Sequence, residues 1–467
     1  MLQMDPQMLD ELTRRILDAG SQASDDDGDA ELRQAVIWPV TCTVGPGLEG
    51  AIACETRVGF VNGSRGALSY RGYDIFDLCA HSSFEEVSYL LLHGNLPDAR
   101  QLKRFTRHLV RYRQMPQTLR HLMSFPVERM HPMEALRLGV NLMRHEFTAV
   151  DAERPGREPA EVIAADDDSI AMETQPTGSR KAVYEFAPPP SASRPSLPDH
   201  SAGREAGIEA CYHLIAGLPV LAAAIARLRE GRLPTEPRAD LSHAANLLYM
   251  LLGREPTPVE ERAMDVSLIL HADHGMNAST FASLVVASTL SDIYFAVGAG
   301  ISALNGPLHG GANERVVHML HEIGEPEAVK TWYRRMRRNK QKVMGFGHRV
   351  YRACDPRARA LKPLAELLSS ENASCRKLLD VAMRLENEVV RDLGKSKRIF
   401  PNVDLYSGIV YASMAIPSQL FTPLFAVSRV AGWTARVMEY LQNNRIFRPR
   451  AAYIGPTGCT YVSLPER

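Results

Sequence analysis

The stretch Asn305-Gly-Pro-Leu-His-Gly-Gly-Ala-Asn-Glu314 determines how the rest of this chain is interpreted. It places one histidine, His309, between glycines and just ahead of an apolar-periodic run that predicts a helix. Glycines let backbone N–H groups approach a ligand, and the positive end of a helix favours negative charge on that ligand. The same position disfavours a protonated imidazole, so His309 is a candidate neutral hydrogen-bond donor. A structural role for this histidine remains open at this point.

Three other stretches concentrate histidine, aspartate and arginine. They are His271-Ala-Asp-His274 with Asn277-Ala-Ser-Thr280, then Gly345-Phe-Gly-His-Arg-Val-Tyr351 followed by Asp355-Pro-Arg357, and finally Asn402-Val-Asp-Leu-Tyr-Ser-Gly408. The spacing of His271 and His274 predicts that both lie on one helical face and project towards one cavity. A metal-binding pair would have the same spacing, but no third ligand pattern stands nearby and the arginines of the other stretches would repel a cation. Histidines satisfied by hydrogen bonds in the core are the other interpretation.

Three arginines indicate an anion site. Arg357 follows Asp355, Arg429 lies in the apolar run 421–430, and Arg448 ends the last helical segment. Because a buried unpaired charge is costly, an arginine in apolar sequence usually has an anionic partner, and its guanidinium suits a small carboxylate. Internal ion pairs remain an alternative for each of them. The basic run 334–342 is either a solvated helix face or a contact for a phosphorylated ligand.

The composition is that of an ordinary globular chain. Its 467 residues contain 54 basic and 54 acidic residues, so no net field directs it to nucleic acid or to an anionic membrane. The seven cysteines are scattered without a CxxC pair, which favours reduced thiols and a cytoplasmic location. Acidic residues at positions 5, 10 and 11 argue against a signal peptide. The apolar stretch 281–304 contains Asp292 and predicts a buried helix rather than a membrane span.

The pattern along the chain predicts an all-α protein with a minor N-terminal β-hairpin. Helical periods recur over residues 84–92, 101–115, 132–144, 207–228, 241–252 and 260–271, and a hairpin signal ends at Asn62-Gly63. The leader, 1–36, begins with an amphipathic segment and continues into an acidic one, and disorder is its default interpretation. Residues 151–203 are rich in proline and predict a flexible insertion.

In this order and spacing, the four stretches closely resemble citrate synthase in its shorter bacterial and archaeal form. The resemblance runs from about Gly47 to Pro449 and is interrupted by the insertion. It implies a homodimer in which a large helical domain (37–305 and 418–467) and a small one (306–417) enclose the active cleft. The implied reaction is a Claisen-type condensation of acetyl-CoA with oxaloacetate, followed by thioester hydrolysis, without a metal or cofactor.

The resemblance also implies a role for each matching residue. Asp404 removes a proton from acetyl-CoA, His309 donates a hydrogen bond to the thioester oxygen, and His348 protonates the carbonyl of oxaloacetate. The implied oxaloacetate-binding residues are His274, His348, Arg357 and Arg429, with Arg448 reaching in from the partner subunit. The implied CoA contacts are Lys342, Val343, Met344, Gly345 and Phe346.

Two alternatives stay open at this stage. A 2-methylcitrate synthase shares these catalytic residues and uses propionyl-CoA, and one methylene changes binding by only about 1–3 kcal/mol. A non-catalytic scaffold that acts through residues 151–203 would tolerate changes in the site, and the intact set of site residues argues against it.

Overall fold

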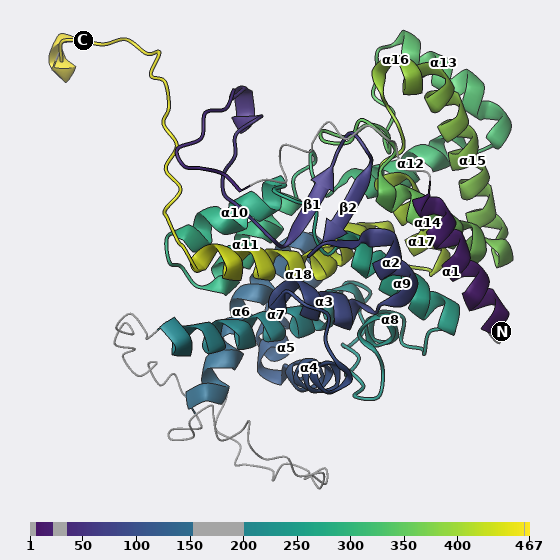
Figure 1. The fold of residues 1–467 in the computed structure, drawn as a ribbon, viewed down its shortest axis with the longest axis horizontal. Coiled ribbons are helices and arrows are strands. Elements are labelled where there is room, and N and C mark those ends of the chain that lie inside the picture. The colour runs from purple at the N-terminus through teal and green to yellow at the C-terminus, as the bar shows by residue number, and fades with distance from the viewer. Residues whose placement is uncertain (1–5, 22–34, 153–199, 462) are drawn as a thin grey trace, which may run out of the picture.

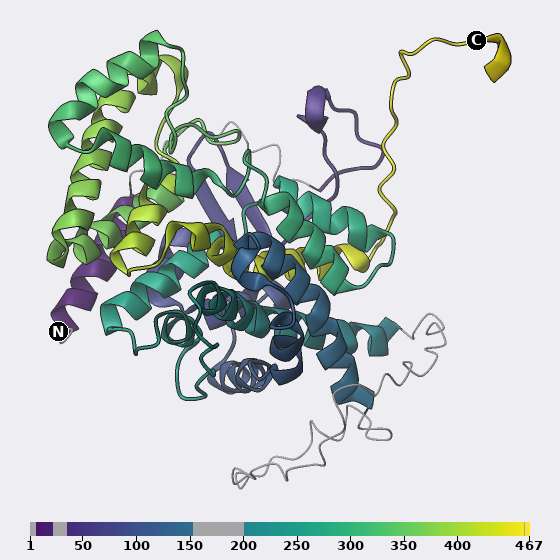
Figure 2. The same ribbon diagram turned by 180° about the vertical axis from the view of Figure 1, so that it is seen from behind.

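The computed structural model describes residues 6–21, 35–152, 200–461 and 463–467, and this part of the chain is mainly helical (Figures 1 and 2). The predicted all-α class is therefore confirmed. The predicted insertion, 151–203, and the acidic part of the leader lie outside the described residues, apart from the ends of the insertion, which belong to helices.

The helices and strands are named in chain order. Their bounds are α1 Pro6–Gly20, β1 Gly59–Asn62, β2 Ala67–Tyr70, β3 Tyr73–Asp74, α2 Ile75–His81, α3 Phe84–His93, α4 Ala99–Tyr112, α5 Pro116–Leu122, α6 Pro132–Ala152, α7 His200–Arg229, α8 His243–Leu252, α9 Pro258–His271, α10 Ala278–Ser288, α11 Ile293–Leu304, α12 Ala312–Ile323, α13 Val329–Arg338, α14 Pro356–Leu368, α15 Ala373–Val389, α16 Lys395–Lys397, α17 Asp404–Ser413 and α18 Phe421–Leu441.

The expected hairpin is present and carries a short third strand. The strands pair antiparallel in the order β1-β2-β3, with Gly59 opposite Tyr70 and Asn62 opposite Ala67. At the β1–β2 turn, the carbonyl of Gly63 accepts a hydrogen bond from the N–H of Arg352 at 2.8 Å. A Cβ at Gly63 would lie 2.4 Å from the carbonyl oxygen of Val350, so only glycine permits this approach. The hairpin thereby supports the loop that follows His348.

Helix α18 forms the centre of the core. Its residues from Phe421 to Val437 are buried, and it packs against α3, α7, α9, α10 and α11. Within α7, Gly207–Arg229 is long and apolar enough to cross a membrane. Of its apolar stretch, however, 89% is buried inside the protein, as in the core helix of a globular fold. The apolar stretch 281–304 forms two helices, α10 and α11, because Asp292 caps the N-terminus of α11 and ends the continuous run.

The amphipathic segment at the start of the leader forms helix α1, and this helix is docked, whereas disorder was the default interpretation of the leader. Leu12 and Ile16 are buried in the main core cluster, and α1 packs against both α2 and α14 (Figure 1). Arg15 pairs with Glu366 of α14. Arg359, also from α14, donates a hydrogen bond to the carbonyl of Ala19 at 3.0 Å. The helix therefore joins α2 of the predicted large domain to α14 of the predicted small domain, although the domain boundaries themselves stay a prediction.

Candidate active site

A single large cleft gathers most of the predicted site residues. Its volume is about 3150 Å³, several times the roughly 300–1000 Å³ of a typical small-ligand pocket, so it can hold two substrates. The predicted residues that line it are His274, His309, His348, Arg357, Asp404, Arg429 and Arg448. These residues come from five separate parts of the chain, which the fold brings to one place.

His309 lies in the turn before α12, where the opening glycine-rich stretch predicted it. A Cβ at Gly310 would lie 2.4 Å from the carbonyl oxygen of Leu304, so glycine lets this turn pack against the end of α11. The N–H of Ser279 donates to Nε2 of His309 at 3.3 Å, and the hydroxyl of Ser279 lies 2.8 Å from the same atom. Because a backbone N–H can only donate, Nε2 is an acceptor and the imidazole proton is on Nδ1.

The charge on His309 is set mainly by burial rather than by the helix. Burial, together with the smaller effects of Arg429 and Arg357, lowers the pKa of His309 to about 4. The imidazole is therefore neutral at pH 7 and can donate through Nδ1–H without first losing a proton. The sequence attributed this neutral state to the dipole of α12, whereas the structure attributes it to desolvation and to the nearby arginines.

His348 has the opposite tautomer. The N–H groups of Val350 and Tyr351 both donate to its Nδ1, at 3.0 and 3.2 Å. The proton of a neutral imidazole must then be on Nε2. Burial lowers the pKa of His348 to about 4 as well, although Asp355 acts in the opposite direction. The cleft thus holds two neutral histidines whose tautomers are fixed by backbone donors.

The prediction that His271 and His274 share one helical face was wrong. Helix α9 ends at His271, and the chain then turns, so that only His274 lines the cleft. His271 is fully buried with its Nδ1 2.7 Å from the carbonyl oxygen of Ser267. Among the residues that the structure describes, no group of three or more His, Cys, Asp or Glu side chains could hold a metal ion.

The predicted arginines Arg357 and Arg429 are both buried and both line the cleft. Arg357 is held by Asp355 through two hydrogen bonds, from Nε at 3.0 Å and from Nη2 at 2.8 Å. Arg429 is 1% exposed, and its Nε donates to the carbonyl of His271 at 2.6 Å. Its Nη2 has no hydrogen-bond partner within the described part of the chain. Burial lowers the pKa of Arg429 to about 10, so it remains charged and retains an unused donor for an anion.

Asp404 is the first residue of α17 and is connected to the neighbouring loops. Its N–H donates to the side chain of Asn402 at 3.1 Å, and the amide nitrogen of Asn402 donates to the carbonyl of Gly347 at 3.0 Å. Burial raises the pKa of Asp404 to about 7, although Arg357 acts in the opposite direction. A position at the N-terminus of a helix favours an ionised carboxylate, but desolvation has the larger effect here. A carboxylate with this pKa is a stronger base than an ordinary aspartate.

The predicted CoA segment, 342–346, does not line the cleft but borders it through Gly347. Gly345 has a φ of +81°, which favours glycine, and a Cβ there would lie 3.1 Å from Val316 of α12 and 3.2 Å from Leu405 of α17. Glycine at this position therefore allows a tight turn that packs against both helices. Its carbonyl accepts a hydrogen bond from the N–H of Asn402 at 2.9 Å. The segment is therefore tied to the loop that carries Asp404.

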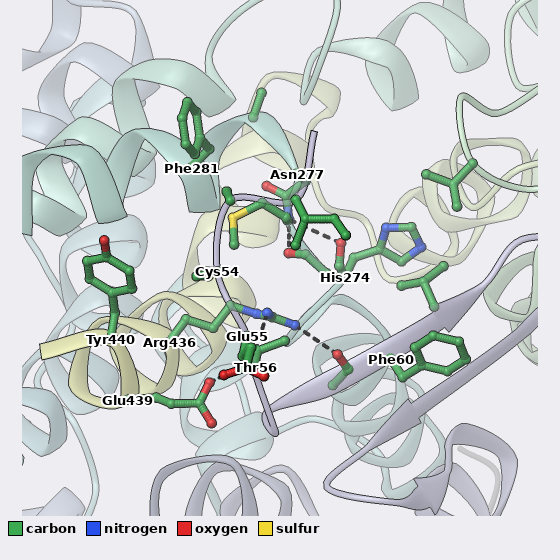
Figure 3. A pocket seen from close by; sticks show the side chains of 18 of the residues that line it. Cys54, Glu55, Thr56, Phe60, His274, Asn277, Phe281, Arg436, Glu439 and Tyr440 are labelled. Atoms are coloured by element: carbon green, nitrogen blue, oxygen red, sulfur yellow. Dashed lines mark hydrogen bonds between the residues drawn. The ribbon is translucent and has the colours of Figure 1, made fainter. Parts of the chain in front are cut away.

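A buried ion pair beside the cleft was not predicted. Arg436 donates to the two carboxylate oxygens of Asp273, both at 2.7 Å. Arg436 also donates to Thr56 at 3.2 Å, and Figure 3 shows it extending from α18 towards this residue, with Glu439 nearby. Arg436 lies seven residues after Arg429, which places both on one face of α18, and this spacing was the available signal.

Comparison with known proteins agrees with the geometry of the cleft. Residues 47–450 match the family model described as citrate synthase, C-terminal domain. The chain is 41% identical to the citrate synthase of Acidithiobacillus ferridurans over 90% of its length and 98% of the relative's, and 39% identical to citrate synthase 2 of Bacillus subtilis over the same shares.

Solved structures of similar proteins give the same result. The citrate synthase of Pyrobaculum aerophilum superimposes with a TM-score of 0.76 at 38% identity, covering 93% of this chain and 99% of that one. The enzyme of Thermoplasma acidophilum, solved in a ternary complex with carboxymethyl coenzyme A and oxaloacetate, has a TM-score of 0.75 at 31% identity, covering 91% of this chain and 100% of that one. The chain belongs to the citrate synthase family, the transferases that condense acetyl-CoA with oxaloacetate in a Claisen reaction.

Proposed function

We propose that oxaloacetate binds between Arg357, Arg429, His274 and His348. The observation that carries this proposal is the unpartnered Nη2 of the buried Arg429, which lines the cleft beside neutral histidines. A dicarboxylate would supply the anionic partner that this guanidinium lacks, and bidentate binding suits its planar fork. Because Asp355 already neutralises Arg357 in part, the site keeps its net positive charge mainly on Arg429.

Proton removal from acetyl-CoA is assigned to Asp404. The α-proton of a thioester is weakly acidic, so the base needs both a raised pKa and a donor that stabilises the enolate oxygen. The carboxyl of Asp404 has the raised pKa, and His309 supplies a neutral N–H donor. His348, protonated on Nε2, is positioned to hydrogen-bond and protonate the carbonyl oxygen of oxaloacetate as the new carbon–carbon bond forms. In this scheme the arginines balance the negative charge of bound oxaloacetate and the neutral histidines supply hydrogen bonds, so the proposal calls for no metal or cofactor.

The CoA moiety is assigned to the segment 342–346. Lys342 is exposed and can face a phosphate, and the segment is followed directly by Gly347, which lines the cleft. The hydrogen bond between Gly345 and Asn402 would let CoA binding stabilise the loop that carries Asp404.

The active form is proposed to be a homodimer completed by the C-terminal segment. After α18 the chain extends away from the body of the molecule (Figure 1) and exposes large apolar side chains, including Ile446, Tyr453, Ile454 and Tyr461. A monomer rarely leaves such a segment uncovered. Arg448 lines the cleft of its own chain in the single subunit. Packing of this segment on a second copy would bury the segment and bring Arg448 to the partner's oxaloacetate site instead. A cytoplasmic location rests on the sequence alone.

The direct test measures CoA release with a thiol reagent, with oxaloacetate present and acetyl-CoA and propionyl-CoA compared in parallel. We expect release with acetyl-CoA preferred, and a loss of at least about 1000-fold in Asp404→Asn with oxaloacetate binding retained. Asp380→Asn, at a half-exposed aspartate on α15 that pairs with Arg376 and does not line the cleft, is the matched control and should behave like the wild type. A propionyl-CoA preference would instead indicate a 2-methylcitrate synthase. No oxaloacetate-dependent release with either substrate would contradict the proposal.

A further inference from the structure

Tyr351 contacts two of the histidines in the cleft through different groups. Its hydroxyl lies 3.1 Å from Nε2 of His274, and its backbone N–H donates to Nδ1 of His348. The three rings are mutual neighbours, with centroid distances of 5.2 Å between the histidines, 5.4 Å from Tyr351 to His274 and 4.8 Å from Tyr351 to His348. Tyr351 itself is 2% exposed and does not line the cleft. It therefore acts on the site through the histidines.

The hydrogen bond between Tyr351 and His274 has a defined direction. Burial raises the pKa of Tyr351 well above its usual range and lowers the pKa of His274 well below its own, so both groups are neutral. Within the described residues the hydroxyl proton of Tyr351 has no acceptor other than Nε2 of His274. A phenol is also a better donor than acceptor towards a neutral imidazole nitrogen. Donation from the hydroxyl to Nε2 leaves the proton of His274 on Nδ1.

We propose that Tyr351 is a positioning residue that fixes His274 in the Nδ1–H tautomer, so that this imidazole presents a donor to bound oxaloacetate. In the other tautomer a bare nitrogen lone pair would face a carboxylate or carbonyl oxygen, which is repulsive. The tyrosine comes from the predicted small domain and His274 from the predicted large one, so the hydrogen bond forms only where the two meet. The inference rests on the proposed oxaloacetate role of His274.

The test compares Tyr351→Phe with Tyr294→Phe. The control removes the hydroxyl of another buried tyrosine, which lies 2.8 Å from Nδ1 of His213 and does not line the cleft. In Tyr351→Phe we expect KM for oxaloacetate to rise about three- to ten-fold, while kcat and KM for acetyl-CoA change less than about two-fold. Tyr294→Phe should leave all three constants unchanged.

A double-mutant cycle separates tautomer control from a general packing effect. In a His274→Ala background, Tyr351→Phe should add no further change to KM for oxaloacetate. An equal effect of Tyr351→Phe with and without His274, or an unchanged KM in the single variant, would overturn the proposal. If Tyr351→Phe does not fold, nitrogen-15 NMR of the imidazoles in the wild-type protein decides, because a proton on Nε2 of His274 would also overturn it. Failure of the wild type to bind oxaloacetate at all would instead remove the site on which the inference rests.

Discussion

Gly432 on α18 allows the closest backbone contact beside the cleft, and its replacement by alanine gives a sharp prediction. A Cβ at this position would lie 2.2 Å from the carbonyl oxygen of Ala272 and 3.1 Å from Cα of Asp273. Close C–H···O contacts have C···O distances of about 3.3 Å, so α18 and the 272–273 segment must separate by roughly 1 Å. The bonds from Arg436 to Asp273, both 2.7 Å, and from Arg429 to His271, 2.6 Å, would then lengthen beyond 3.5 Å.

The expected cost follows from these broken contacts. Overpacking typically costs about 1–3 kcal/mol, and disruption of a buried ion pair about 3–5 kcal/mol, so we expect Gly432→Ala to lose at least about 3 kcal/mol of unfolding free energy. Because Arg429 moves with α18, KM for oxaloacetate should also rise by more than about ten-fold.

Thermal unfolding and steady-state kinetics check both parts of this prediction. Gly298→Ala on α11 is the matched control, since its Cβ would meet only the side chain of Asn141 at an ordinary 3.5 Å. Alanine is a better helix former than glycine by about 0.5–1 kcal/mol, so this variant should equal or exceed the wild type in stability. A Gly432→Ala enzyme with the same thermal unfolding midpoint and the same KM for oxaloacetate as the wild type would refute the reasoning.

Three further predictions follow from the cleft and from α1. Asp404 is a base only when ionised, and its pKa is raised to about 7, so below about pH 7 kcat/KM for acetyl-CoA should decrease, with the slope approaching ten-fold per pH unit. A kcat/KM that stays constant from about pH 5.5 to 8 would contradict this. Ser279→Ala removes the hydroxyl next to His309 but keeps the backbone donor, so kcat should fall about three- to ten-fold with KM for oxaloacetate unchanged, and a KM effect alone would count against the proposed role. Ile16→Ala should cost about 2–5 kcal/mol in a denaturation experiment, whereas the exposed Asp10→Ala should cost nearly nothing; equal stabilities would show that α1 does not dock in solution.

Much of the cleft could be predicted because its residues carry local signals. A histidine between glycines before a helix and an arginine within apolar sequence are each unusual, and His309 and Arg429 both line the cleft. The errors came from assumptions about local continuity. Two histidines three residues apart share a face only if the helix continues, and α9 ends at the first of them. Similarly, the N-terminal position of Asp404 indicated the helix dipole but not the larger effect of burial.

The remaining contacts join residues that are far apart in sequence, so no local pattern could reveal them. Asp273 and Arg436 are separated by 163 positions, and His274 and Tyr351 by 77. Asp273, His274 and Tyr351 do lie in the distinctive stretches, but nothing in those stretches names their partners, and only the packing of α18 and of the loop after Gly347 brings the partners together. Burial is equally invisible in a single sequence, and it sets the protonation states of the cleft.

The docking of α1 has a consequence for how fast the cleft can open and close. Helix α14 carries Arg357 at its start, and α1 touches α14 on one side and α2 on the other. Any rotation of α14 relative to α2 must shear or detach the buried side chains of Leu12 and Ile16, each worth about 1.5–3 kcal/mol of burial. Helix α1 would therefore resist such a rotation, and detaching it would add to the barrier of any closure that moves α14 relative to α2. Two enzymes with identical catalytic residues could then differ in turnover through a helix that no substrate touches.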